Sequence, residues 1–149
     1  MNDGPGRVAR EWLASLVARR LPDTAMVEPV AVGWATVELE RAAGEQVAAL
    51  GGGVAFETAP PDDLLGARCL IARPPGLPAW VLLEPSTEGP LAAFLVRHGE
   101  GLAAGWVGGQ AMGLGVRRSA PAGTPVGRSR LVIDGPRWGP FLLIVDDDP

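Results

Sequence analysis

This chain of 149 residues has no lysine and no tyrosine, and His98 and Cys69 are its only histidine and cysteine. These absences exclude Schiff-base lysine chemistry, tyrosine acids, an intrachain disulfide and any metal site built from several His or Cys ligands. Cys69 lies within the apolar run 69–72, so we interpret it as a small buried side chain rather than a nucleophile.

Long apolar runs and an excess of positive charge are also missing. No stretch approaches the roughly 18 apolar residues that a membrane span needs, and the N-terminus lacks the core of a signal peptide. The formal net charge is −4 and the arginines are scattered, which argues against nucleic acid as a partner. With 47% hydrophobic and 20% charged residues, we expect a cytoplasmic, single-domain globular protein that binds neither membrane nor nucleic acid.

The N-terminal segment has the pattern of an amphipathic helix. Between Arg7 and Leu21, apolar residues recur at helical spacing, namely Val8, Trp12, Leu16 and Val17. We expect residues 1–26 to form a helical extension that packs on the domain or on a second subunit rather than on a membrane.

The next part of the chain alternates strand and helix patterns. The sequence predicts strand, helix, strand, strand and strand, over 30–39, 40–50, 54–58, 67–73 and 79–84, with a turn at 60–63. The helix should bury Leu39, Ala43, Val47 and Leu50. A further short helix is predicted over 91–98, with Pro90 at its start and Gly99 at its end.

The second half of the sequence repeats this order of elements, with weaker similarity and a shortened helix. Val32-Gly33-Trp34-Ala35 aligns with Ala104-Gly105-Trp106-Val107, and the segment 80–83 aligns with 141–144. The second helix is shortened, because 108–113 holds too many glycines. The sequence therefore predicts an α+β fold of two βαβββ modules that form a curled mixed sheet around a cavity, plus an extra N-terminal helix.

The centre of the chain carries three linked motifs, Leu82-Leu83-Glu84-Pro85, Phe94-Leu95 and Gly99-Glu100-Gly101-Leu102. This passage resembles the vicinal oxygen chelate superfamily, which includes the glyoxalases, and within it the methylmalonyl-CoA epimerase-like members. The resemblance implies a vicinal oxygen chelate domain over 27–149, with modules at about 27–86 and 100–149 joined by helix 91–98. It also implies a cavity on the concave face of the sheet.

Enzymes of this superfamily usually hold a divalent metal in that cavity. The resemblance puts the metal ligands at Ala31, Val81, Ala103 or Ala104, and Leu142 or Leu143. None of these side chains offers a lone pair to a metal. We therefore expect a protein without metal or other cofactor, whose cavity is apolar.

The hypothesis for the site follows from these positions. We expect an apolar or acyl-type small molecule to be bound by Ala31, Val81, Ala103, Ala104, Trp106, Leu142 and Leu143. Its polar end would meet one of Arg68, Arg73 or Arg117. Strand alternation predicts that Trp34 and Trp80 face away from the cavity and leaves the placement of Trp106 and Trp138 open.

Other polar residues have competing interpretations. His98 suits the end of a helix, and Glu84 and Glu100 suit structural roles at turns. A carboxylate facing an apolar cavity would have a raised pKa and could act as a general base, with Glu57 and Asp134 as candidates.

Three functions stay open on the sequence alone. The first is binding of a small molecule without metal, and the second is a metal-independent lyase, isomerase or cyclase that uses a cavity carboxylate. The third is a degenerate partner subunit, which the N-terminal helix would suit. A homodimer is compatible with each of them, and no residue pattern decides whether there is turnover.

Overall fold

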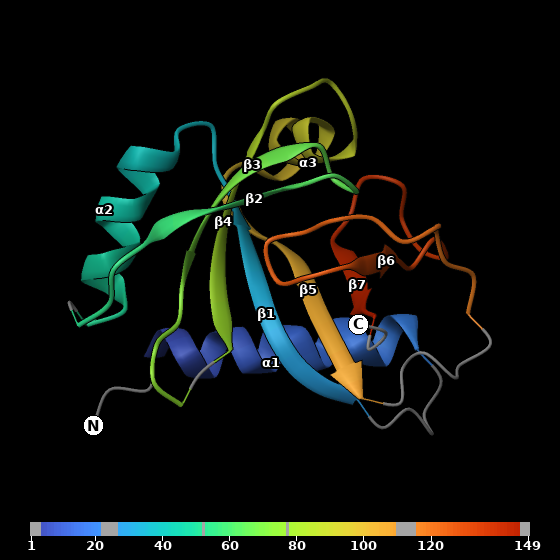
Figure 1. The fold of residues 1–149 in the computed structure, drawn as a ribbon, viewed down its shortest axis with the longest axis horizontal. Helices are drawn as coiled ribbons and strands as arrows, with labels where there is room; N and C mark the ends of the chain where they lie inside the picture. Colours follow the sequence, from blue (N-terminus) through green and yellow to red (C-terminus); the bar gives the residue numbers. More distant parts are fainter. Residues whose placement is uncertain (1–3, 22–26, 52, 77, 110–115, 147–149) are drawn as a thin grey trace.

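The structure is a computed structural model that describes residues 4–21, 27–51, 53–76, 78–109 and 116–146. These residues form three helices and seven strands (Figure 1). In chain order the elements are α1 (Gly4–Arg20), β1 (Val27–Ala35), α2 (Leu39–Ala49), β2 (Glu57–Asp62), β3 (Ala67–Ala72), β4 (Ala79–Pro85), α3 (Pro90–His98), β5 (Gly101–Gly109), β6 (Ser129–Leu131) and β7 (Phe141–Val145).

All the strands belong to one mixed sheet of order β2-β3-β4-β1-β5-β7-β6. The two central strands, β1 and β5, run antiparallel, and each has a parallel neighbour from its own half of the chain, β4 and β7 respectively. The two modules therefore pair with each other within one chain. The predicted α+β class with a curled mixed sheet and an N-terminal helix is confirmed.

Most predicted elements lie within a few residues of the observed ones, but β2 does not. The expected turn at 60–63 is instead part of β2, which runs through Pro60 and Pro61 to Asp62. The prolines are tolerated because β2 is an edge strand and its pairing with β3 is irregular between Ala59 and Asp62. The glycine-rich segment 108–113, predicted to be too rich in glycine for a stable helix, falls partly on β5 and otherwise lies outside the described residues.

Helix α1 packs on the sheet through much of the predicted face, since Leu16 is buried and Trp12 and Val17 pack against the same cluster, but Val8 does not. Its most buried residues are Ala9, Leu13 and Leu16, whereas Val8 is 56% exposed. Leu13 occupies the space where a side chain at Gly105 of β5 would begin, so the missing side chain lets the helix approach the strand closely. In α2 the most buried residues are Leu39, Ala42 and Gln46, so the face toward the sheet includes an amide that the apolar pattern did not indicate.

The sheet separates two hydrophobic clusters. One lies between the sheet and helices α1 and α2, and we call it the helix-side cluster. It includes Leu13, Leu16, Val32, Leu39, Trp80, Leu82, Leu142 and Ile144. The other covers the opposite surface, and we call it the concave-face cluster. It includes Ala31, Ala35, Cys69, Ile71, Val81, Leu83, Phe94, Ala103, Ala104, Trp106, Phe141 and Leu143.

These clusters correct the alignment of the two modules. Trp34 packs on the helix side and Trp106 in the concave-face cluster, although the repeat had paired them. Trp80 and Phe141, also paired by the repeat, lie on opposite faces in the same way. A shift by one residue moves a side chain to the other face of a strand, so the predicted alignment was wrong by an odd number of positions. The predicted orientation of Trp34 and Trp80 is confirmed.

Candidate functional site

The positions that the resemblance assigned to metal ligands meet on the concave face. Ala31, Val81, Ala104 and Leu143 all belong to the concave-face cluster, and each has an exposed fraction of 0%. Leu142 belongs to the helix-side cluster, so Leu143 is the residue of β7 that fits the predicted site.

Ala103 also belongs to this cluster because it is the extra residue of a bulge. The pairs Gly33–Ala104 and Trp34–Leu102 flank it, and no residue of β1 lies opposite it. Both alternatives for the β5 position, Ala103 and Ala104, are therefore on the predicted face.

The indole of Trp106 fills the centre of this face. Trp106 pairs with Ala31 across β5 and β1, and its ring extends over Gly33. A Cβ atom at Gly33 would lie 3.0 Å from Cζ3 of Trp106 and 3.2 Å from Cβ of Ala104. Because Trp106 itself is 0% exposed, the hollow that the sequence predicted is occupied at its centre by side chains.

These residues do not fit a divalent metal. Alanine, valine and leucine side chains have no donor atoms, and the indole N–H is a donor without a lone pair for a metal. Among the described residues, no group of three or more His, Cys, Asp or Glu side chains is arranged to hold a metal ion.

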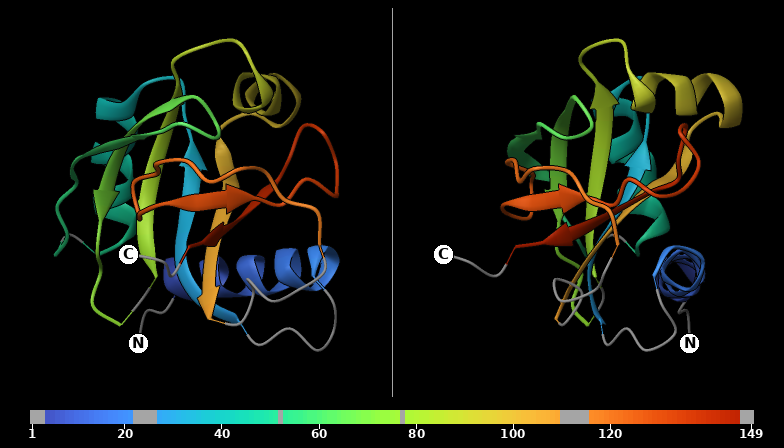
Figure 2. Two further views of the ribbon diagram at one scale, coloured as in Figure 1. Left: turned by 45° about the vertical axis from the view of Figure 1, so that its right-hand side comes forward. Right: turned by 90° about the vertical axis from the view of Figure 1, so that its right-hand side faces the viewer.

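A segment of the second module, residues 119–126, lies over the concave face, and we call it the covering segment. It passes in front of β5 and β1 in Figure 1, on the side of the sheet opposite α1 (Figure 2). Val126 packs against the concave-face cluster, and Thr124 is buried. The N–H of Asp63 donates to the carbonyl oxygen of Gly123 at 2.9 Å, which joins this segment to the turn after β2.

Asp62, at the start of that turn, is a buried carboxyl group that the sequence analysis missed. It is 1% exposed, and its Oδ1 accepts hydrogen bonds from the N–H groups of Leu64 and Leu65 at 2.9 and 2.8 Å. Its Oδ2 has no hydrogen-bond partner among the described residues. Burial raises the pKa of Asp62 to about 6. The sequence Pro60-Pro61-Asp62-Asp63 is typical of a solvent-exposed turn, so the burial of Asp62 was not predicted.

Two further groups on this face are buried. The Nε1–H of Trp106 has no partner in the described part of the chain, and such an unpaired buried donor costs about 1–3 kcal/mol. Burial raises the pKa of the Cys69 thiol to about 12, and the negative charge of Asp62 adds to the effect. The thiol therefore stays protonated, in line with its interpretation as a small apolar side chain.

The two glutamates of the resembling motifs stabilise the turn between β1 and α2. Glu84 accepts a hydrogen bond from the N–H of Leu39 at 3.1 Å and pairs with Arg68 at 2.6 Å. Glu100 accepts from the N–H of Val37 at 3.0 Å and also pairs with Arg41. Burial alone would raise the pKa of Glu100, but these hydrogen bonds outweigh it and lower the pKa. The structural roles predicted for both glutamates are confirmed.

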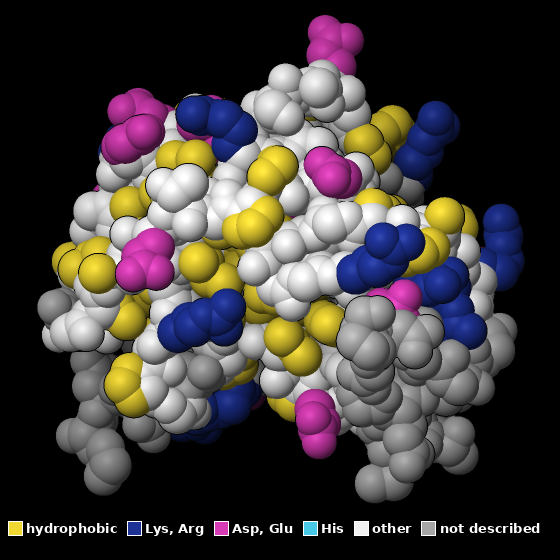
Figure 3. All heavy atoms as spheres, viewed as in Figure 1, with side chains coloured by type: hydrophobic (Ala, Val, Ile, Leu, Met, Phe, Trp, Pro, Cys, Tyr) yellow, Lys and Arg dark blue, Asp and Glu magenta, His cyan; other side chains and the backbone are white. Residues whose placement is uncertain are grey.

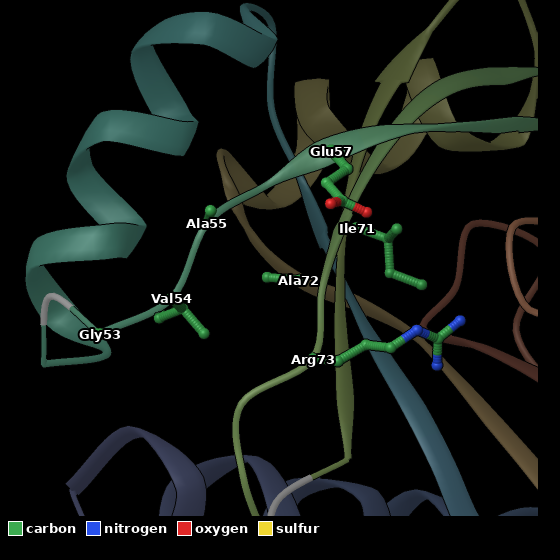
Figure 4. Close-up of a pocket in the computed structure, with 7 residues that line it drawn as sticks. All are labelled: Gly53, Val54, Ala55, Glu57, Ile71, Ala72 and Arg73. Carbon is green, nitrogen blue, oxygen red and sulfur yellow. The ribbon is translucent and has the colours of Figure 1, made fainter.

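A cavity of about 310 Å³ opens where β2 separates from β3, and we call it the rim cavity (Figure 4). It is lined by Gly53, Val54, Ala55, Glu57, Ile71, Ala72 and Arg73. Ile71 also belongs to the concave-face cluster, so the rim cavity adjoins one end of that cluster. The structure thus brings together Glu57 and Arg73, two residues that the sequence offered separately. Figure 3 shows this side of the molecule, with acidic, basic and apolar side chains interspersed.

The other candidates lie elsewhere and have partners. Arg117 and Asp134 pair with each other at 3.6 Å, both exposed. Trp138 lies outside the concave-face cluster, with the guanidinium carbons of Arg97 and Arg137 each 5.1 Å from its ring centroid. His98 is exposed at the end of α3, with its ring 4.7 Å from that of Phe94.

Comparison with solved structures identifies the architecture. The methylmalonyl-CoA epimerase from Mycobacterium tuberculosis superposes with a TM-score of 0.66 at 23% identity, over 89% of this chain and 96% of that chain. The chain has the fold of the methylmalonyl-CoA epimerases. A hypothetical protein from Bacillus halodurans C-125 gives a TM-score of 0.63 at 17% identity, over 84% and 97% of the two chains.

A variant of the Streptomyces coelicolor methylmalonyl-CoA epimerase, in complex with 2-nitronate-propionyl-CoA, gives a TM-score of 0.61 at 18% identity. It covers 84% of this chain and 100% of that chain. No family model and no curated protein sequence matches the chain. The fold that the sequence resemblance implied is therefore shown by structure. No described helix has the length and apolar character needed to cross a membrane.

Proposed function

We propose that this chain is a small-molecule-binding protein of the vicinal oxygen chelate fold that works without a divalent metal. The observation that carries the proposal is the convergence of Ala31, Val81, Ala104 and Leu143 on one buried face, where the resemblance called for metal ligands. An apolar face of this kind favours an apolar or acyl-type molecule. The ligand would contact these residues together with Ala103 and Trp106.

Binding requires the concave face to open, because its central side chains are fully buried. The covering segment is held mainly to β6, by backbone hydrogen bonds of Ser119 with Leu131 and of Ala122 with Ser129, and only weakly to the first module. Among the described residues, one backbone hydrogen bond joins it to the first module, from Asp63 to Gly123. Its other hydrogen bonds, such as that between Thr124 and Ser129, lie within the second module. Once open, the face presents the unpaired Nε1–H of Trp106, which can donate to an acyl carbonyl oxygen.

The complex of a structural neighbour with 2-nitronate-propionyl-CoA supports the acyl alternative, since it shows this fold holding an acyl-type compound. We therefore propose 1-hexanol as a minimal apolar probe and propionyl-CoA as an acyl probe. Both can be titrated calorimetrically into protein prepared without added metal.

Val81→Thr tests the proposal with little change in side-chain volume. It places a hydroxyl among apolar groups, which we expect to weaken binding of 1-hexanol about tenfold, equivalent to about 1.4 kcal/mol. Val96→Thr is the matched control, because Val96 is 88% exposed on α3. Equal affinities of the two variants and the wild type would contradict the assignment of the concave face.

A second candidate function, a metal-independent isomerase or lyase, is favoured by Asp62. Its buried carboxylate is ionised above a pH of about 6 and could remove a proton from the carbon next to an acyl carbonyl. Incubation of propionyl-CoA with the protein in D2O would then introduce deuterium at that carbon, detected by mass spectrometry. Asp62→Asn should abolish the exchange, and exchange that persists in this variant would exclude Asp62 as the base.

The third function, a degenerate partner subunit, was suggested mainly by the N-terminal helix, and the structure no longer favours it. The apolar face of α1 packs on its own sheet through Leu13 and Leu16, so this helix does not present that face to another chain.

A further inference from the structure

The rim cavity has features of a ligand site that the concave face lacks. Its volume of about 310 Å³ is at the lower end of the range for small-molecule sites, which is about 300–1,000 Å³. Its lining is mixed, with the apolar residues Val54, Ala55, Ile71 and Ala72 beside backbone and the charged residues Glu57 and Arg73. The peptide groups of residues 53–56 make no backbone hydrogen bond with another described residue, so they can pair with a ligand.

The two charges of the rim cavity do not neutralise each other. Glu57 pairs with Ile71 across the strands, and Arg73 follows two residues later on the same side of β3. Figure 4 shows the side chain of Ile71 between the carboxylate of Glu57 and the guanidinium of Arg73. No ion pair joins them, and no described carboxylate lies within ion-pair distance of Arg73.

The uncompensated arginine sets the chemistry of the ligand. A guanidinium presents parallel N–H donors that match the two oxygens of a carboxylate. A phosphate carries a greater negative charge, and the nearby Glu57 would repel it more strongly. A single carboxylate on an apolar body therefore fits the rim cavity best, with the body directed over Ile71 toward the concave-face cluster.

We propose that the rim cavity binds the carboxylate of an apolar monocarboxylic acid, with Arg73 as its cation and Ile71 as the contact that leads to the concave face. This inference rests on the proposed function, because it names the polar end of the same ligand. Glu57 acts against binding of the anion and limits the net negative charge that the site accepts.

Calorimetric titration with hexanoate and 1-hexanol tests this assignment, because the probes share a chain length and differ in charge. Arg73→Gln should weaken binding of hexanoate about tenfold or more and leave the affinity for 1-hexanol unchanged. Glu57→Gln should strengthen binding of hexanoate a few-fold. Arg10→Gln removes the same charge from an exposed position on α1 and should change neither affinity.

The outcomes separate this inference from the proposed function. If Arg73→Gln affects hexanoate no more than Arg10→Gln does, or if hexanoate does not bind, the rim cavity is not a carboxylate site. If affinity for hexanoate depends on Arg73 while Val81→Thr has no effect on either probe, the rim cavity binds the carboxylate and the concave-face proposal fails.

Discussion

The indole ring of Trp106 lies directly over Gly33, and the absent side chain of the glycine gives it the space. A Cβ atom at Gly33 would be 2.7 Å from Cδ1 of Leu83 as well as 3.0 Å from Cζ3 of Trp106. The small residues Ala31 and Ala104 lie around the same ring, in the concave-face cluster. The concave face is thus built around an aromatic side chain, among the positions that the sequence resemblance assigned to metal ligands.

Gly33→Ala should lower the free energy of unfolding by about 1–3 kcal/mol, because the added methyl group overpacks this region. Trp106→Leu in the same chain should recover part of that loss, which urea denaturation can measure. Gly44→Ala is the control, since nothing lies within 4 Å of that position in α2, and it should stabilise the protein by about 0.5–1 kcal/mol. Additive effects of Gly33→Ala and Trp106→Leu would show that the two residues are not coupled.

Gly105→Ala should disturb the docking of α1. The new methyl group would occupy the space now filled by Leu13, so the helix must shift or detach. We expect faster hydrogen exchange of the α1 amides and a loss of about 1–3 kcal/mol in stability. Protection of α1 equal to the wild type would mean that the helix adapts to the methyl group without moving.

Asp62 should make stability depend on pH. Because burial raises its pKa from 3.8 to about 6, the folded state binds the proton more tightly than the unfolded state does. Its favourable contribution is complete below pH 3.8 and is lost as the pH rises through about 6. The shift corresponds to about 3 kcal/mol, so Asp62→Asn should gain up to this amount over the wild type between pH 4 and pH 8.

Urea denaturation across this pH range measures the gain. Asp63→Asn is the control for removing one negative charge from the same turn, because Asp63 is exposed. If the difference in stability between Asp62→Asn and the wild type does not vary with pH, the carboxyl group of Asp62 is not desolvated as described.

Glu100 should contribute with the opposite sign. Its pKa is lowered below the ordinary value of 4.5, so its stabilising effect is present above that pH and is lost as the pH falls. Relative to Glu100→Gln, the wild type should therefore lose stability on acidification below pH 4.5. A thermal-unfolding series from pH 7 to pH 3 on both proteins checks the direction, and a constant difference would contradict the hydrogen bonding to Val37.

The sequence predicted those parts of the fold that depend on local pattern. Helix α3 follows from Pro90, Gly99 and the spacing of Leu91 and Phe94, and the apolar run over β4 marks a strand buried on both faces. The course of β2 through Pro60 and Pro61 could not be predicted, because prolines are acceptable there only where a neighbouring strand is missing. Whether a neighbouring strand is present depends on the topology of the whole sheet, and the sequence of the segment does not reveal it.

The site shows a similar division. Alternation along β1 and β4 correctly separated Ala31 and Val81 from Trp34 and Trp80. The alternation could not reveal that the ring of Trp106 occupies the concave face. That placement depends on the absence of a side chain at Gly33, which is on another strand. The burial of Asp62 likewise does not follow from the local pattern, since the sequence 60–63 is typical of an exposed turn.

Native mass spectrometry of the protein prepared without added metal tests the central claim most directly. The account predicts an organic adduct and no metal, even after incubation with equimolar Mn²⁺, Co²⁺ or Zn²⁺. A stoichiometric metal adduct of the wild-type protein would contradict it.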